Sequence, residues 1–419
     1  MTRLFKPQGV NNVHKKHALT FVTITVFLDT VGFGIIVPIL PEFLVLIGNI
    51  SLSEASALSG YLIFSYAVTN FLFAPLLGNL SDAHGRKPLL VLSLFVYGAA
   101  YLLSGFATAL WMLFLGRLLT GITSATYAIA NALIADVSTP EDKAQNFGLM
   151  GVAFGLGFIV GPALGGIIGA WDLRAPFFIA AGLAFTNTLY GLLFFRETLA
   201  PENRRPFDLR RASPWGSLSQ LRKYPLLIGL ILAVFLNNIG HHIWPANWNF
   251  YTIEKFAWTP MDVGLSMAFV GVMSVAVQGG LLRIVIPKFG PVRCAYFGIV
   301  ATIAAFAGVA TAGSAWALYF WCGVSSLGGL AGPSVNSILS NQVAADSQGE
   351  LQGIMASVSS VAMIIGPLLL TQTFSYFTSA SAPIYLPGSA FWVSALLTAL
   401  ALIIFYRQIR RLPNPTGIA

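Results

Sequence analysis

The sequence predicts an all-α integral membrane protein in which twelve transmembrane helices form two pseudo-symmetric six-helix bundles. Charged residues make up only 9% of the 419 residues, whereas a soluble domain carries about 25%. Apolar runs of about 20 residues recur along the whole chain, and each is long enough to cross a bilayer as a helix. Motifs of the first half also return in the second half, which indicates a duplicated bundle.

The apolar runs set the predicted spans. They lie at about 18–40, 55–77, 88–107, 110–134, 146–169, 175–195, 225–245, 260–282, 292–311, 315–339, 351–374 and 386–406. The 41 glycines and 22 prolines are compatible with these spans, because both residues are common in transmembrane helices. The polar segments then divide the chain into an N-terminal segment (1–17), a first bundle (18–195), a linker (196–224), a second bundle (225–406) and a tail (407–419).

Lysine and arginine are distributed unevenly between the two sides of the predicted membrane. Of 23 such residues, 20 lie at the termini or in loops on the same side, and only Arg174 and Lys255 lie in the opposite loops. Because positive residues accumulate in cytoplasmic loops, we expect both termini in the cytoplasm and the protein in the cell (inner) membrane. Topology therefore accounts for the net charge of +8, and no nucleic-acid partner is expected.

Two pairs of similar segments support the duplication. FLDTVG (Phe27–Gly32) matches FLNNIG (Phe235–Gly240) at an offset of 208 residues. GLMGVAFGLGFIVGP, ending at Pro162, matches GIMASVSSVAMIIGP, ending at Pro367, at an offset of 205 residues. Parallel repeats of this kind, with a site between them near the midplane, are typical of transporters.

A polar motif, GNLSDAHGRKPLL, separates the second and third predicted spans. It resembles the loop between helices two and three of the major facilitator superfamily, which has Gly, two or three variable residues, Asp, two variable residues and then Gly-Arg-Lys/Arg. The resemblance implies a cytoplasmic gate formed by Gly78, Asp82, Gly85, Arg86, Lys87 and Asp136.

The same resemblance implies a role for each member of this gate. Asp82 is expected to lie against the N-terminus of helix eleven, where exposed N–H groups and the helix dipole favour an anion. Arg86 is expected to bridge towards Asp136 at the end of helix four, while Gly78 and Gly85 allow close approach and a tight turn. The gate would hold the bundles closed on the cytoplasmic side and bias the equilibrium between outward-open and inward-open states.

The fifth predicted span contains a second motif, with the spacing Gly-x8-Gly-x3-Gly-Pro-x2-Gly-Gly. This spacing resembles the helix-five signature of the twelve-helix drug:proton antiporter group. Small residues also let membrane helices pack closely, so the motif is expected at a helix interface. Its members are Gly148, Gly157, Gly161, Pro162, Gly165 and Gly166.

Within that group the chain is most similar to the tetracycline-efflux branch, over nearly its full length. The similar segments include LDTVGFGIIVPILP, GRLLTGITSATYAIANALIADVS, NFGLMGVAFGLGFIVGPALGG and GELQGIMASVSSVAMIIGPLLLT. That branch is known for intramembrane acids in helices one, three and nine, of which only the first is present here, as Asp29. The resemblance therefore implies a drug antiporter without specifying tetracycline as its cargo.

Four ionisable residues near the middle of predicted spans are candidates for proton coupling: Asp29, Arg117, His241 and His242. A charge at the bilayer centre costs at least ~2.5–3.5 kcal/mol, so each of them is a functional candidate. An apolar environment disfavours the ionised carboxylate, so Asp29 is expected to bind and release a proton; the alternative is a structural bond to a neighbouring helix. Arg117 stays charged and is expected to face an acid, a substrate or a water-filled cavity, or to bridge helices.

The two histidines are adjacent, so on a helix they point about 100° apart and at most one faces a cavity squarely. Proton relay, substrate hydrogen bonding and a packed polar contact all remain open for them. They are poor joint metal ligands, and neither a metal nor a cofactor is expected. An interfacial aromatic belt, rather than the alternative of a drug-binding cage, is expected just beyond them, at Trp244, Trp248, Phe250 and Tyr251.

These patterns and the resemblance together predict a secondary active transporter. It would exchange protons for small amphipathic compounds such as drugs, by alternating access, as a monomer in the lipid bilayer. An importer or facilitator of a small metabolite, or a siderophore exporter, on the same fold is the alternative. An enzyme or receptor is not expected, because the sequence has no nucleotide-binding loop, metal cluster or nucleophile motif.

Overall fold

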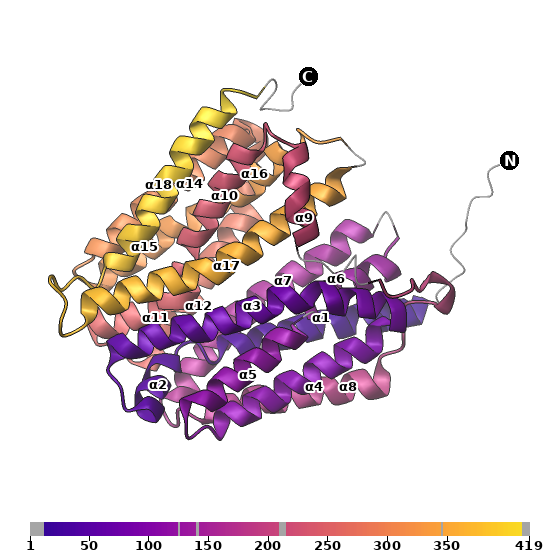
Figure 1. The fold of residues 1–419 in the computed structure, drawn as a ribbon, viewed down its shortest axis with the longest axis horizontal. Coiled ribbons are helices and arrows are strands. Elements are labelled where there is room, and N and C mark those ends of the chain that lie inside the picture. Colours follow the sequence, from indigo (N-terminus) through magenta and orange to yellow (C-terminus); the bar gives the residue numbers. More distant parts are fainter. Residues whose placement is uncertain (1–11, 125, 140–141, 209–214, 345–346, 413–419) are drawn as a thin grey trace.

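The computed structural model describes residues 12–124, 126–139, 142–208, 215–344 and 347–412. All regular elements among these residues are helices. The helices form two bundles side by side, one from each half of the chain, and both termini lie at the same end of the molecule (Figure 1). We call this end, where the first helix begins and the last one ends, the termini face.

The first bundle follows the chain from the N-terminus to the linker. Its helices are α1 (Asn12–Gly34), α2 (Leu40–Gly48), α3 (Leu52–His84), α4 (Arg86–Gly105), α5 (Leu110–Thr123), α6 (Thr126–Val137), α7 (Lys143–Gly169) and α8 (Ala175–Phe194). The linker contains η1 (Pro201–Asn203), α9 (Trp215–Gln220) and η2 (Leu221–Lys223).

The second bundle contains more interrupted helices than the first. Its elements are α10 (Ile228–His241), α11 (Ile243–Phe256), α12 (Pro260–Val275), the π-helix η3 (Ala276–Leu281), α13 (Leu282–Phe289), α14 (Pro291–Thr311), α15 (Ala315–Ser326), the 3₁₀-helix η4 (Leu327–Leu330), α16 (Ala331–Ser340), α17 (Gln348–Thr378) and α18 (Ser389–Ile409).

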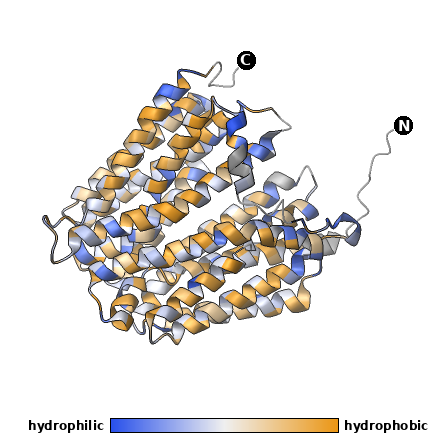
Figure 2. Cartoon of the chain, viewed as in Figure 1, coloured by the Kyte–Doolittle hydropathy of each residue, from blue (hydrophilic) through white to orange (hydrophobic). Residues whose placement is uncertain are grey.

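The helices confirm the twelve predicted spans. Ten helical stretches of the chain are long and apolar enough to cross a membrane, and one of them is made by α5 and α6 together. The other two predicted spans are divided: α10 and α11 form the seventh, and α15, η4 and α16 form the tenth. The long helices consist mostly of hydrophobic residues, whereas the most hydrophilic residues gather at helix ends and loops (Figure 2). This is the distribution that a bilayer requires.

The two bundles touch each other mainly at the face opposite the termini. There Ser53 Oγ donates to Ser375 O at 2.7 Å, and Gln372 Nε2 donates to Ala57 O at 3.1 Å. Ser56 Oγ also donates to Asn247 Oδ1 at 3.1 Å, and Asn249 Nδ2 donates to Val37 O at 2.7 Å, at the same face. Towards the termini the bundles diverge, and α9 of the linker packs against α17 between them (Figure 1). The molecule is therefore closed on one side of the membrane.

The predicted aromatic belt is wrong. Trp248, Phe250 and Tyr251 are buried in the second bundle rather than exposed at an interface. Trp248 Nε1 donates to Ser266 Oγ at 2.9 Å, and the Tyr251 hydroxyl donates to the carbonyl of Val309. The reason is that the seventh span continues as α11 beyond its predicted end and turns these rings into the core.

Candidate functional site

The first bundle encloses a cavity of about 290 Å³ that contains both Asp29 and Arg117. Helices α1, α3, α4, α5, α6 and α7 supply its walls. Aromatic side chains surround the two ionisable residues, so the cavity combines apolar area with phenolic hydrogen-bonding groups. Its principal lining residues are Asp29, Tyr66, Tyr97, Tyr101, Arg117 and Phe158. The structure thus brings together two of the four proton-coupling candidates.

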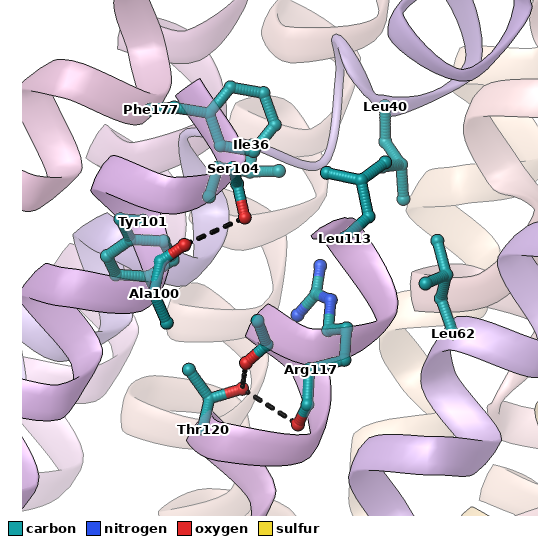
Figure 3. Close-up of a pocket in the computed structure, with 11 residues that line it drawn as sticks. Ile36, Leu40, Leu62, Ala100, Tyr101, Ser104, Leu113, Arg117, Thr120 and Phe177 are labelled. Carbon is teal, nitrogen blue, oxygen red and sulfur yellow. Dashed lines mark hydrogen bonds between the residues drawn. The ribbon is translucent and has the colours of Figure 1, made fainter. Parts of the chain in front are cut away.

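Arg117 has an unusual environment for a cation inside a membrane protein. Figure 3 shows its guanidinium pointing from α5 into a second, small cavity of about 20 Å³, which borders Tyr101 and Ser104. Thr120 satisfies its own hydroxyl within the helix by donating to the carbonyl of Gly116 at 2.9 Å. In the described part of the chain no hydrogen bond or ion pair occupies the guanidinium, and none joins it to Asp29. A cation left open in this way can hold water or an anionic group.

The tyrosines of this cavity were not predicted from the sequence. Tyr97 and Tyr101 are four residues apart on α4, so both point from one face of that helix. Their ring centroids are 6.1 Å apart in an edge-on arrangement. Tyr66 of α3 completes the group. The spacing of Tyr97 and Tyr101 by four residues within an apolar span was the feature of the sequence that could have indicated a shared polar face on α4.

The histidines lie in the second bundle and face different surroundings. His241 lines a cavity of about 390 Å³, and its Nδ1 is 3.0 Å from the carbonyl of Asn237. His242 packs towards α17, where a Cβ added to Gly366 would lie 3.0 Å from its Cδ2 atom. Only His241 therefore faces a cavity, as the 100° spacing predicts. Neither histidine shares the cavity of Asp29.

Arg86 forms the bridge that the resemblance implied. Its Nε donates to Asp136 Oδ2 at 3.1 Å, and its Nη1 donates to Ser81 and Asp82. The guanidinium thereby joins the end of α3, the start of α4 and the end of α6. Gly85 between these helices has a φ of +106°, a conformation that favours glycine.

Two of the gate expectations differ from this arrangement. Asp82 pairs with Arg86 of its own bundle, and within the described chain no hydrogen bond or ion pair joins it to α17. The first turn of α17 instead contains its own acid, Glu350, which accepts from Lys223 Nζ at 2.7 Å. That hydrogen bond raises the pKa of Lys223 above its usual value. Gly78 makes no close approach, since an added Cβ would meet no atom within 4 Å.

Sequence reasoning missed Glu197, which lies just after α8. One carboxylate oxygen accepts from the backbone N–H of Arg86 at 2.9 Å, and the other accepts from Lys87 at 3.0 Å. The first oxygen also accepts from the N–H groups of Thr198 and Leu199, each at 3.0 Å. Glu197 therefore caps the start of α4 from a distant part of the chain. The start of the predicted linker therefore packs against the loop between α3 and α4. The only sign of this contact in the sequence was an acidic residue within a basic segment.

The helix-five glycines pack α7 against two neighbours. An added Cβ at Gly157 or Gly161 would lie 2.7 or 2.9 Å from atoms of α1, and one at Gly165 would lie 2.0 Å from the carbonyl oxygen of Ile35, just after α1. At Gly166 it would lie 2.5 Å from the carbonyl of Pro260, at the start of α12 in the other bundle. These four glycines therefore lie where α7 closely approaches its neighbours.

Of the two remaining residues of the motif, Pro162 makes a close helix contact and Gly148 does not. Pro162 belongs to the contact between bundles, because a Cβ added to Gly264 of α12 would lie 2.3 Å from its carbonyl oxygen. Gly148, at the end of α7 nearest the termini, meets no atom within 4 Å. Its expected packing role is absent here because the bundles diverge towards the termini face.

Comparison with known proteins gives one family match. The family model of the Major Facilitator Superfamily matches residues 22–367. The class C tetracycline resistance protein of Escherichia coli is 35% identical over 360 residues, which is 86% of this chain and 90% of that protein. The class H tetracycline resistance protein of Pasteurella multocida is 34% identical and covers 94% of this chain and 97% of its own length.

More distant similarity extends to a multidrug protein and to solved structures. Multidrug resistance protein 2 of Bacillus subtilis is 25% identical over 82% of this chain and 85% of its own length. The crystal structure of the human organic anion transporter MFSD10 has a TM-score of 0.68 and 23% identity, covering 93% of this chain and 99% of that one. The nucleoside transporter NupG has a TM-score of 0.75 and 13% identity, covering 94% and 99%. These structures share the fold.

Proposed function

This chain belongs to the Major Facilitator Superfamily of secondary transporters, and from that premise we propose that it exports small amphipathic compounds in exchange for protons. The near full-length similarity to tetracycline and multidrug resistance proteins supports export of drug-like molecules. Two acids that the tetracycline branch is known for have no counterpart in the third and ninth spans of this chain. The proposal therefore concerns amphipathic compounds as a class.

One observation supports proton coupling above all: Asp29 and Arg117 share a cavity without being paired to each other. A carboxyl group in apolar surroundings is neutral when protonated and costly to bury when ionised. A nearby guanidinium, which always remains charged, stabilises the ionised form when the two approach. A change in their separation between two states would make Asp29 take up a proton in one state and release it in the other.

The arrangement of the bundles supports alternating access. With the termini in the cytoplasm, as the lysine and arginine distribution favours, the closed face would be external and the structure would represent an inward-facing state. Closure of the termini face would bring the gate residues and α17 together, while the contact between Ser53 and Ser375 would open. A single chain contains both bundles, so we propose a monomer in the inner membrane as the transporting unit.

Transport into inside-out membrane vesicles tests the proposal. Vesicles containing the protein should accumulate tetracycline or tetraphenylphosphonium when their lumen is acidified, because outward proton flow drives the compound inward. A protonophore should abolish the accumulation, and vesicles without the protein provide the baseline. Accumulation only in right-side-out vesicles would indicate an importer and contradict the proposal.

A further inference from the structure

The second bundle contains cavities whose chemistry differs from that of the Asp29 cavity. The cavity of about 390 Å³ next to His241 adjoins another of about 210 Å³, and Asn237 and Asn238 border both. The polar side chains that line them are amides, hydroxyls, one imidazole and one indole, and none of the lining residues is Asp, Glu, Lys or Arg. These walls offer hydrogen bonds without a fixed charge.

Asn237 occupies the position in the second bundle that Asp29 occupies in the first. The two residues stand at the same place in the related segments FLNNIG and FLDTVG. Within the described chain the Asn237 Oδ1 atom is buried and has no hydrogen-bond partner. A buried amide oxygen in that condition requires a donor from water or a ligand. The duplication has thus placed a carboxyl group in one cavity and an unsatisfied amide in the other.

The backbone around the larger cavity is also specialised. The π-helix η3 and the 3₁₀-helix η4 pack against each other at its wall. Gln278 projects from η3, and a Cβ added to Gly329 of η4 would lie 3.3 Å from its Cγ atom. Irregular backbone at membrane depth is tolerated where it lines a cavity or is buried in protein, and π-bulges are frequent at functional sites. Both interruptions of the α-helical backbone, η3 and η4, therefore lie beside the side chain of Gln278.

We propose that this cavity binds the uncharged, hydrogen-bonding part of the cargo, with Asn237 and Gln278 as its specificity-determining residues. The inference rests on the proposed export function and adds a division of labour to it. The first bundle holds the ionisable groups, and the second recognises neutral amide, hydroxyl or ketone groups of the transported compound. The preferred cargo therefore carries such groups in addition to its apolar surface.

Equilibrium binding to the purified protein in detergent tests the inference. The two probes are chloramphenicol, an uncharged amide with hydroxyl groups, and tetraphenylphosphonium, a cation without hydrogen-bonding groups. Gln278→Leu should raise the Kd for chloramphenicol by about three- to tenfold, the loss expected for one hydrogen bond. The Kd for tetraphenylphosphonium should stay unchanged. Gln145→Leu, at an exposed position of α7 outside both cavities, is the matched control.

Two further variants keep the test independent of folding. Gln278→Glu and Asn237→Asp preserve side-chain size and introduce a charge, so both should weaken chloramphenicol binding and strengthen tetraphenylphosphonium binding. Equal changes for the two probes, no change for either, or failure of the wild-type protein to bind chloramphenicol would each overturn the inference. The binding assay needs no pH gradient, so the variants can discriminate between the probes even if the protein shows no gradient-driven export. Failure of this inference is therefore distinguishable from failure of the proposed export function.

Discussion

At the scale of single residues, Glu197 fixes the start of α4 from a distant part of the chain. Its carboxylate accepts hydrogen bonds from backbone N–H groups at the start of α4 and from those of the residues that follow α8. The bend at Gly85 brings the same carboxylate close, since an added Cβ there would lie 2.3 Å from Glu197 Oε2. The positive φ and this close approach both require glycine.

Replacing Glu197 with Gln should destabilise the folded protein. The glutamine amide has no negative charge, and its NH2 group cannot accept hydrogen bonds from the backbone N–H groups. We therefore expect the free energy of unfolding to fall by about 1 kcal/mol, as is typical of a removed helix cap. The measurement is thermal unfolding of the purified protein. Glu202→Gln, at an exposed position of η1, is the control. A melting temperature equal to that of the control would contradict the capping role.

The sequence predicted some residues of the site better than others, for physical reasons. Asp29 and Arg117 were predicted because a charge in an apolar run is costly and therefore conspicuous. Glu197 was not, because the amides it binds belong to Arg86 and Lys87, which are more than a hundred positions away. The spacing rule showed that one histidine at most would face a cavity, but only the packing of α10 against α17 identifies it as His241.

At the scale of elements, α7 is held between α1 of its own bundle and α12 of the other. Four glycines of its motif lie on the two faces that make these contacts: Gly157, Gly161, Gly165 and Gly166. Close helix approach in membranes relies on such small residues, because lipid supplies little hydrophobic drive for association. The motif therefore sets how near α7 can come to both neighbours.

Two substitutions within this motif should have different effects. Gly161→Leu places a side chain against the carbonyl of Val31, at 2.9 Å from the first added atom, and overpacking of this kind costs about 1–3 kcal/mol. Gly148→Leu enters open space and should leave thermal stability unchanged. Thermal unfolding and transport of both variants provide the measurement. Equal stability of the two variants would show that the spacing of these glycines is incidental.

The two cations on the face opposite the termini also act on helix ends. Arg174 Nη1 donates to the carbonyls of Gly105 and Ala107, at 2.7 and 2.8 Å, just where α4 ends. Lys255 Nζ donates to the carbonyl of Ala310 at 3.0 Å, in the last turn of α14. Cations stabilise helix C-termini in this way. Both exceptions to the positive-inside pattern are therefore explained by capping.

Helix boundaries were predictable where hydropathy alone decides them. The seventh span was placed too short because α11 contains Asn247, Asn249 and Thr252, whose polar side chains end the apolar run. All three are buried, and Asn249 Nδ2 donates to the carbonyl of Val37 at 2.7 Å. Ser56 of the other bundle donates to Asn247 Oδ1, while Thr252 donates to carbonyls of its own helix. Local hydropathy contains no information about these partners.

At the scale of the whole molecule, the proposed alternating-access mechanism requires the contact between the bundles at the closed face to break. Ser53 Oγ and Ser375 Oγ lie 3.3 Å apart there, close enough for cysteines at these positions to form a disulfide. Oxidation of the Ser53→Cys/Ser375→Cys double variant should stop transport, and a reducing agent should restore it. Cys294 and Cys322 are buried, so they should not interfere. Unchanged transport with the disulfide verified would contradict alternating access at this face, and Ser53→Cys alone is the control.

The account depends above all on Asp29 as the group that couples the cargo to protons, and one comparison in proteoliposomes tests this directly. Purified Asp29→Asn protein is assayed for exchange of labelled tetraphenylphosphonium without a pH gradient and for gradient-driven accumulation of the same probe. The account predicts that exchange persists, because the amide preserves the size of the side chain, while driven accumulation falls to the level of empty liposomes. Driven accumulation equal to that of the wild-type protein would contradict it.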